Sequence, residues 1–290
     1  MKLEITVTSP DITPADSRQH AVAVGGVLPT YQFLPVLPQR AGTAIPPVVD
    51  LTVAHSWSGA TDEADDAAVA AVMAVAGSVA LWRAWRRYRT VDDVVRVYVV
   101  EVDRVAGSLP AVGTAMQSAL AGVAVLDSQV EVYGTGDELP AYQRQARGAS
   151  ALLWTAVPTE PVRIARVFDR VDPVTGPAFD PAHPHLDAPE ILAYLDAGAA
   201  LLATTQRMVD VLDPTRGPVV PMSYRTDGQW IWTDTVSYYL REHRLAPDAE
   251  LLEHIREHGS RPPAVTAVGL HRAQAALFAP ADVAPAWTAA

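Results

Sequence analysis

The sequence predicts an α+β fold, in which a mixed-sheet N-terminal domain precedes a mainly helical region that contains a β-hairpin. Six of the ten residues 94–103 are valines in a near-continuous run, which is typical of a central strand buried on both faces of a sheet. After residue 187, helix start and stop signals alternate with short apolar runs. Two of these runs flank Asp227-Gly228, a strong hairpin signal.

The composition divides the 290-residue chain into four segments. We expect an α/β-type mixed-sheet domain over residues 1–157, a proline-rich linker over 158–186, a helical region with a hairpin over 187–278 and a mobile tail over 279–290. The length is enough for one large or two modest domains.

The longest predicted helix covers residues 62–89, after a stretch of short strands that prolines interrupt. Its acidic start and arginine-rich end match the helix dipole, and Thr61 is the expected N-cap. Trp82, Trp85 and Tyr88 would share one face of this helix. That face is either packed core or an aromatic platform for nucleic acid, and the formal charge of −11 favours core.

Four elements are expected after the strand at 94–103. They are a helix over 111–122, a strand over 123–133, a turn over 134–137 and a helix over 140–154. The turn contains two glycines but lacks the third glycine of a phosphate-binding loop, because Leu139 occupies that place.

Three helices are expected in the C-terminal region. The first runs from a capping box at Asp187 to about residue 211. The second is capped by Thr233 or Asp234 and continues through His243. The third starts near Pro247 and stops at Gly259.

Missing residue types exclude several kinds of chemistry. The chain has no cysteine and a single lysine, Lys2. Thiolate nucleophiles, disulfides, cysteine-bound metals, P-loop lysines and Schiff-base lysines are therefore excluded, and we expect no cofactor. The acidic balance disfavours nucleic acid and anionic membranes as partners.

The longest uncharged run, residues 67–82, is shorter than the roughly 20 residues that cross a bilayer. We therefore expect a buried helix there and no membrane segment. The N-terminus alternates polar and apolar residues like an edge strand rather than a signal peptide. Together with the absence of cysteine, this predicts a cytoplasmic protein.

The histidines form two candidate sites. His254 and His258, with Glu257, match the H-x-x-E-H pattern of a zinc protease. No glutamate follows Glu257 to complete a metal site, so we expect solvated side chains and no bound metal. His183 and His185 lie in a proline-rich loop, which on its own does not provide a full ligand set.

An aromatic segment in the C-terminal region is the best candidate for binding. Trp230 and Trp232 are two residues apart and therefore share one face of a strand. They are either core residues or part of a groove for a protein partner, since Trp, Tyr and Arg dominate interface energetics. The candidate binding residues are Tyr224, Arg225, Asp227, Trp230, Trp232 and Tyr238.

The stretch from Arg225 to Trp232 (RTDGQWIW), with YYLREH at residues 238–243, resembles a C-terminal module of actinobacterial proteins. The resemblance extends over about residues 187–259. No activity is established for that module, so the resemblance implies no catalytic residue. The near-exclusive use of arginine over lysine also indicates a GC-rich, actinobacterial-like source.

We therefore expect a non-enzymatic cytoplasmic protein that binds a protein partner, in the form of an immunity-like inhibitor or an assembly component. Its acidic surface would steer it toward basic partners. The alternative is a small-molecule enzyme, with acid–base residues from the 180–187 loop and the 225–234 hairpin in one pocket. The sequence favours the first of these.

Overall fold

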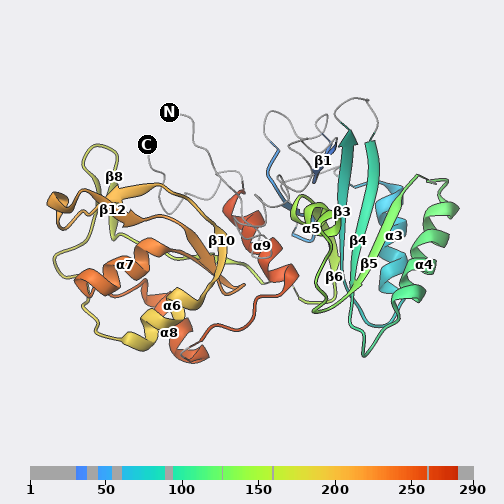
Figure 1. The fold of residues 1–290 in the computed structure, drawn as a ribbon. Helices are drawn as coiled ribbons and strands as arrows, with labels where there is room; N and C mark the ends of the chain where they lie inside the picture. Colours follow the sequence, from blue (N-terminus) through green and yellow to red (C-terminus); the bar gives the residue numbers. More distant parts are fainter. Residues whose placement is uncertain are drawn as a thin grey trace. The chain divides into compact units, whose positions relative to one another are not determined.

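The computed structural model describes residues 31–37, 45–53, 61–88, 94–125, 127–158, 160–259 and 261–279 (Figure 1). The chain divides into two compact units. Of the described residues, those between 31 and 160 and those at 274–279 form the first unit, and those at 161–259 and 261–273 form the second. Mixed sheets and helices confirm the predicted α+β fold.

The first unit contains a mixed six-stranded sheet, with five strands in the order β2-β6-β3-β4-β5 and β1 paired with β3. Its strands are β1 (Tyr31–Leu34), β2 (Val49–Asp50), β3 (Ser78–Tyr88), β4 (Val94–Val102), β5 (Gln129–Gly134) and β6 (Ala151–Thr155). β4 lies between β3 and β5, and its second half is fully buried. The central strand predicted at 94–103 is therefore confirmed.

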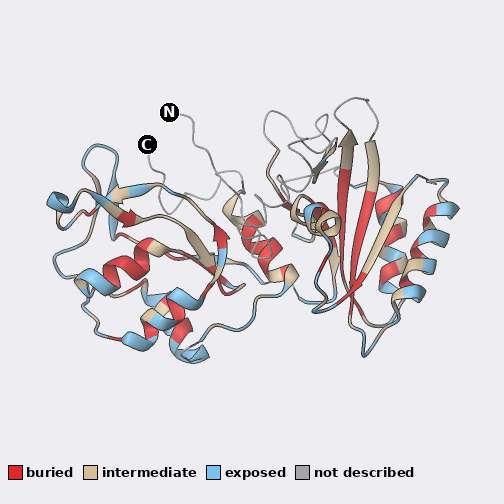
Figure 2. Ribbon diagram, viewed as in Figure 1, coloured by how far each residue is buried: buried red, intermediate tan, exposed pale blue. Residues whose placement is uncertain are grey.

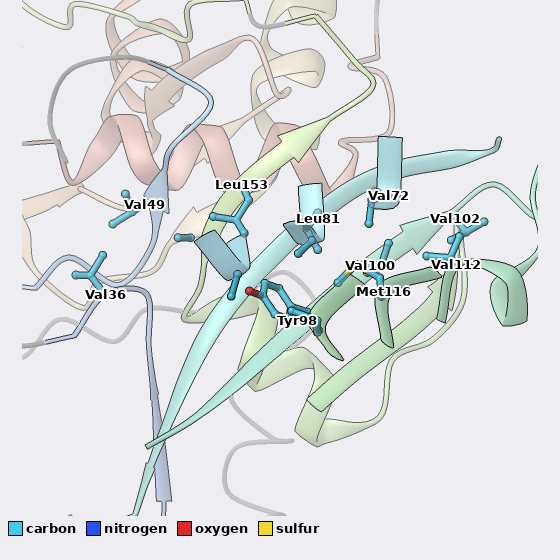
Figure 3. Packing of buried hydrophobic residues seen from close by; sticks show 14 residues of the cluster. Val36, Val49, Val72, Leu81, Tyr98, Val100, Val102, Val112, Met116 and Leu153 are labelled. Atoms are coloured by element: carbon cyan, nitrogen blue, oxygen red, sulfur yellow. The ribbon is translucent and has the colours of Figure 1, made fainter. Parts of the chain in front are cut away.

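Helices cover this sheet. α3 (Glu63–Met73) and α4 (Leu109–Gly122) lie side by side on one face, whereas α5 (Ala141–Gly148) lies toward the other (Figure 1). Leu81, Tyr98, Val100 and Met116 fill the core between α3, α4 and the sheet (Figure 3). Figure 2 shows the resulting buried strip along β3 and β4.

The helix predicted over 62–89 is wrong in its second half. α3 ends at Met73, and Gly77 turns the chain with a φ of +79° before β3 begins. A Cβ atom on Gly77 would lie 2.3 Å from the backbone nitrogen of Gly107, so only glycine fits. Residues 78–88 become a strand because they pair with the valine-rich β4, and this pairing overrides their helix propensity.

The charges expected at the two ends of one helix instead face each other across the helix–sheet interface. The buried Arg83 of β3 donates to Asp65 of α3, and Arg96 of β4 donates to both carboxylate oxygens of Asp62 at 2.7 Å. Arg96 lowers the pKa of Asp62 to about 2. We call Asp62, Asp65, Arg83 and Arg96 the charge network.

The remaining predictions for the first unit are partly correct. The strand predicted at 123–133 begins only at Gln129, and the helix predicted at 140–154 ends at Gly148. The apolar run after Ser150 pairs with β3 as β6 instead of extending the helix. The predicted turn at 134–137 is confirmed, with Gly136 at a φ of +84°.

The second unit has a four-stranded sheet, β10-β13-β14-β7, and two separate two-stranded ribbons. The sheet strands are β7 (Arg163–Ile164), β10 (Ala199–Leu202), β13 (Tyr224–Thr226) and β14 (Trp230–Thr233). The ribbon strands are β8 (Arg170–Asp172) with β9 (Gly176–Ala178), and β11 (Arg207–Val209) with β12 (Pro218–Pro221). A short 3-10 helix, η1 (Pro214–Arg216), precedes β12.

The helices of this region are α6 (Pro189–Ala197), α7 (Asp234–His243), α8 (Ala249–His258) and α9 (Ala267–Leu277), and the division between the two units falls within α9. The predicted second and third helices and the hairpin at Asp227-Gly228 are confirmed. The helix predicted from Asp187 to about 211 stops at Ala197, because the apolar residues that follow pair with β13 as β10.

Residues 161–186, within the segment expected to be a linker, belong to the second unit. β7 pairs in parallel with β14, and Ala165 and Phe168 are buried. Among the described residues, no helix is long and apolar enough to cross a bilayer.

Candidate functional site: the aromatic hairpin and the exposed ribbons

The six residues predicted to bind a partner all lie in the second unit, on β13, β14, their turn and α7. Trp230, Trp232 and Tyr238 are buried, with exposed fractions of 5%, 0% and 8%. Tyr224 and Arg225 are half-buried. The two tryptophans are thus core residues, and they have little or no surface to offer a partner in this conformation.

Trp232 is fixed by close contacts with α6. Its indole N–H donates to the carbonyl oxygen of Leu195 at 3.1 Å. Gly198 follows the end of α6, and a Cβ atom there would lie 2.3 Å from the Trp232 ring. The absence of a side chain at Gly198 therefore lets the indole reach the end of the helix.

Arg225 ties the hairpin to the ends of two helices. Its Nε donates to Asp234, in the first turn of α7, at 2.6 Å. Its Nη1 donates to the carbonyl oxygens of Asp196 and Gly198, at the end of α6, at 3.0 and 3.1 Å. A cation is favoured at the C-terminus of a helix, so the guanidinium group of Arg225 stabilises the second unit through contacts within that unit.

Asp227 connects the hairpin turn with α6 and α8. Its Oδ1 accepts the backbone N–H groups of Gln229 and Trp230, which stabilises the turn. Its Oδ2 accepts the Tyr194 hydroxyl at 2.8 Å and lies 2.6 Å from Nε2 of His254. Burial and Asp227 raise the pKa of Tyr194 far above its usual range, so the hydroxyl remains a donor.

The contact with Asp227 involves His254, one of the two histidines that match the zinc-protease pattern. His254 is buried against Asp227, contrary to the expected solvated position, whereas His258 is exposed. The two rings lie 4.1 Å apart, and Nδ1 of His258 donates to the carbonyl oxygen of His254. In the part of the chain that the structure describes, no three histidine or acidic side chains are placed to hold a metal.

A second buried carboxylate, Asp210, joins the turn after β11 to α7. Its Oδ2 accepts the Tyr238 hydroxyl at 3.0 Å and lies 2.6 Å from Nε2 of His243. Its Oδ1 accepts the backbone N–H groups of Leu212 and Asp213. Burial raises the pKa of Asp210, but these hydrogen bonds outweigh it and the net pKa is lowered.

His183, in the 180–187 loop, contacts other partners. Its Nδ1 lies 2.9 Å from Asp169, and its Nε2 lies 3.0 Å from the carbonyl oxygen of Ala246, after α7. The small-molecule enzyme considered above would combine the 180–187 loop and the hairpin in one pocket. However, His183 of the loop and Asp227 of the hairpin contact different residues.

The first unit has a shallow hollow of about 350 Å³ beside α3. Leu51, Val69 and Met73 line it, and Asp65 and Asp66 lie at its acidic side.

The two ribbons of the second unit carry exposed apolar side chains. Val174 is 93% exposed, and Val171, Val209 and Leu212 are each nearly half exposed. We call these four side chains the ribbon surface. Figure 2 shows the turn that joins β8 to β9 as largely exposed.

Both ribbons are anchored on α7. Phe168 and Phe179, on either side of the β8–β9 ribbon, pack with ring centroids 5.8 and 4.8 Å from Tyr239. The Tyr239 hydroxyl accepts the backbone N–H of Val211, just after β11, at 3.1 Å. The ribbon surface therefore extends from one shared core.

Sequence reasoning missed the ribbon surface. Its residues lie in or near proline-rich stretches that carry no clear periodic pattern. One available signal was Asp172-Pro173-Val174-Thr175-Gly176, a run of turn-forming residues between two short segments able to form strands. The side chain of Asp172 accepts the backbone N–H groups of Val174 and Thr175 in that turn.

Comparison of the chain with protein-family models, with curated proteins and with solved structures found no match. Function must therefore be inferred from the geometry of the described residues. The tryptophans of the aromatic hairpin belong to the buried core of the second unit, whereas the ribbon surface presents apolar side chains to solvent.

Proposed function

We propose that this chain is a non-enzymatic protein-interaction protein and that it binds its partner through the ribbon surface. One observation carries the proposal. Among the described residues of the second unit, four of the five large exposed apolar side chains lie on the two ribbons. Exposed apolar side chains on ribbons that pack on one shared core are candidates for an interaction site.

The contacts beneath the ribbon surface support this function, because a rigid surface loses less entropy on binding. Asp210 holds the backbone of Leu212 and also contacts His243 of α7. Tyr239 holds the backbone of Val211. We infer that these buried polar groups serve to position Val209 and Leu212 for a partner.

The composition indicates the kind of partner. The formal charge of −11 speeds encounter with a basic protein, as expected for an immunity-like inhibitor or an assembly component. The absence of cysteine suits a reducing compartment, so we propose that the partner is cytoplasmic.

The test is affinity capture at low salt with immobilised full-length chain and lysate from the source organism. We compare the wild type with Val209→Asp and Leu212→Asp, which place a charge on the ribbon surface. The control is Val105→Asp, which makes the same change at a valine of the first unit that is 97% exposed.

We expect one protein to be retained in stoichiometric amount by the wild type and by the Val105→Asp control, and lost with either ribbon variant. Thermal unfolding measured by circular dichroism checks that each variant is folded. Retention of the same proteins by the wild type and by both folded ribbon variants would contradict the proposal, as would a wild type that retains no protein.

A further inference from the structure

β8 is an edge strand with one open side. It pairs with β9 on one side, and no other described strand pairs with it. Its three residues, Arg170, Val171 and Asp172, are all exposed. An edge strand of this kind offers unpaired backbone groups to another strand.

Pro177 determines which backbone groups of β8 are open. Val171 lies opposite Pro177 in the antiparallel ribbon, and proline has no N–H to donate. The Val171–Pro177 pair must therefore be of the type without direct backbone hydrogen bonds. Consequently, the N–H and C=O of Val171 point to the open edge, while those of Arg170 and Asp172 face β9.

The sequence of β8 is complementary to itself in the antiparallel direction. If two copies pair with Val171 opposite Val171, Arg170 of each copy lies opposite Asp172 of the other. The two Val171 residues then exchange two backbone hydrogen bonds about a twofold axis. We propose that β8 binds β8 of a second copy of this chain in this register, which gives a four-stranded antiparallel sheet across a symmetric dimer.

The charges of β8 are available for this pairing. The exposed side chain of Arg170 interacts electrostatically with Asp172 of its own strand, and both charges lie on the face of β8 that a second copy would meet. Oδ1 of Asp172 accepts the backbone N–H groups of Thr175 and Val174 in the turn, each at 2.8 Å. These two N–H groups lower the pKa of Asp172, so the carboxylate is charged at neutral pH.

Side-chain contacts would add to the backbone pairing. Opposite charges on directly opposed residues stabilise an antiparallel pair, and like charges destabilise it. Val171 is 47% exposed in the single chain, and the proposed register places it against the same residue of the second copy. This inference goes beyond the proposed function, because it assigns a second copy of this chain to the β8 side of the ribbon surface.

The test is sedimentation velocity of the full chain over a concentration series. We expect the wild type to dimerise as concentration rises. Arg170→Asp and Asp172→Arg place like charges opposite each other, so each variant alone should remain monomeric. An equimolar mixture restores both opposite-charge pairs and should dimerise.

Two further variants separate edge pairing from a general charge effect. Val171→Pro removes the N–H group that points to the open edge of β8 and leaves the backbone hydrogen bonds to β9 in place. This variant should remain monomeric. Arg261→Asp makes the same charge change at an exposed arginine outside β8 and should dimerise like the wild type. Slow exchange of the Ala178 amide, which faces β8, shows that the ribbon is intact in each variant.

The inference is overturned if the wild type stays monomeric at every concentration. It is also overturned if Arg170→Asp or Val171→Pro dimerises like the wild type, or if the mixture stays monomeric with both ribbons intact. These results leave partner capture through Val209 and Leu212 unaffected. Failure of that capture, in turn, leaves self-association unaffected, so the two proposals can fail separately.

Discussion

Asp65 in the first unit, and Asp210 and Asp227 in the second, are buried carboxylates with different sets of partners. In the first, Asp65 accepts hydrogen bonds from the guanidinium groups of Arg83 and Arg96 and from the Tyr98 hydroxyl. In the second, Asp210 and Asp227 meet tyrosine hydroxyls, histidine rings and backbone N–H groups, and the guanidinium group of Arg216 lies farther away, 3.7 Å from Asp210. The difference matters because a guanidinium is always charged, whereas an imidazole can also donate a hydrogen bond as a neutral group.

Removing a partner should therefore cost more in the first unit than in the second. Loss of Arg83 breaks an ion pair in which both side chains are buried, although Arg96 and the Tyr98 hydroxyl still contact Asp65. Loss of one donor from Asp210 or Asp227 leaves several other donors on the same carboxylate.

The largest effect is expected for Arg83→Met. Arg83 and Asp65 are both buried, and breaking a buried ion pair by removing one partner costs about 3–5 kcal/mol of unfolding free energy. Urea denaturation of the full chain measures this loss. Arg104→Met, which removes an exposed ion pair with Asp137, serves as control and should change stability little. Similar losses for the two variants would contradict the role of burial.

A smaller effect is expected for Asp227→Asn. The amide oxygen can still accept the turn N–H groups of Gln229 and Trp230, but the charge that receives Tyr194 and His254 is lost. Disturbing such a buried hydrogen-bonded group costs about 1–3 kcal/mol, measured by urea denaturation followed by tryptophan fluorescence. Asp187→Asn, at an exposed aspartate, is the matched control. A loss of unfolding free energy as large as that of Arg83→Met would contradict the expected difference between the two units.

The smallest effect concerns the pH dependence of Asp62. Its pKa in the folded protein is about 2, mainly because of the hydrogen bond from Arg96, and lies below the usual value of about 4. Since the folded-state pKa is lowered, Asp62 stabilises the fold above about pH 4, and this contribution is lost as the pH falls toward about 2. The stability difference between wild type and Asp62→Asn should shrink over that range. A difference independent of pH would show that the ion pair contributes nothing.

The sequence predicted elements that depend on local signals. Asp227-Gly228 predicted the hairpin, and the β-branched run predicted β4. Gly259 correctly predicted the end of α8. Residues 78–88 were misjudged because their strand conformation depends on pairing with β4, which their alanines and arginines do not indicate.

The candidate sites were harder to predict because their contacts are distant in sequence. Asp227 and His254 are 27 positions apart, and no local pattern connects the turn of a hairpin to a histidine on a later helix. The ribbon surface depends on exposure, which proline-rich sequence does not reveal. The open edge of β8 depends on Pro177, whose meaning becomes clear only from its register opposite Val171.

The most direct test of the central claim is hydrogen exchange at the Val171 amide, followed at increasing concentrations of the full chain. We predict that this amide becomes protected as concentration rises, while the Asp172 amide, which faces β9, is protected throughout. In Arg170→Asp, the Val171 amide should exchange rapidly at every concentration. Equal exchange of the wild-type Val171 amide at low and high concentration would contradict the claim that the open edge of β8 binds a second chain.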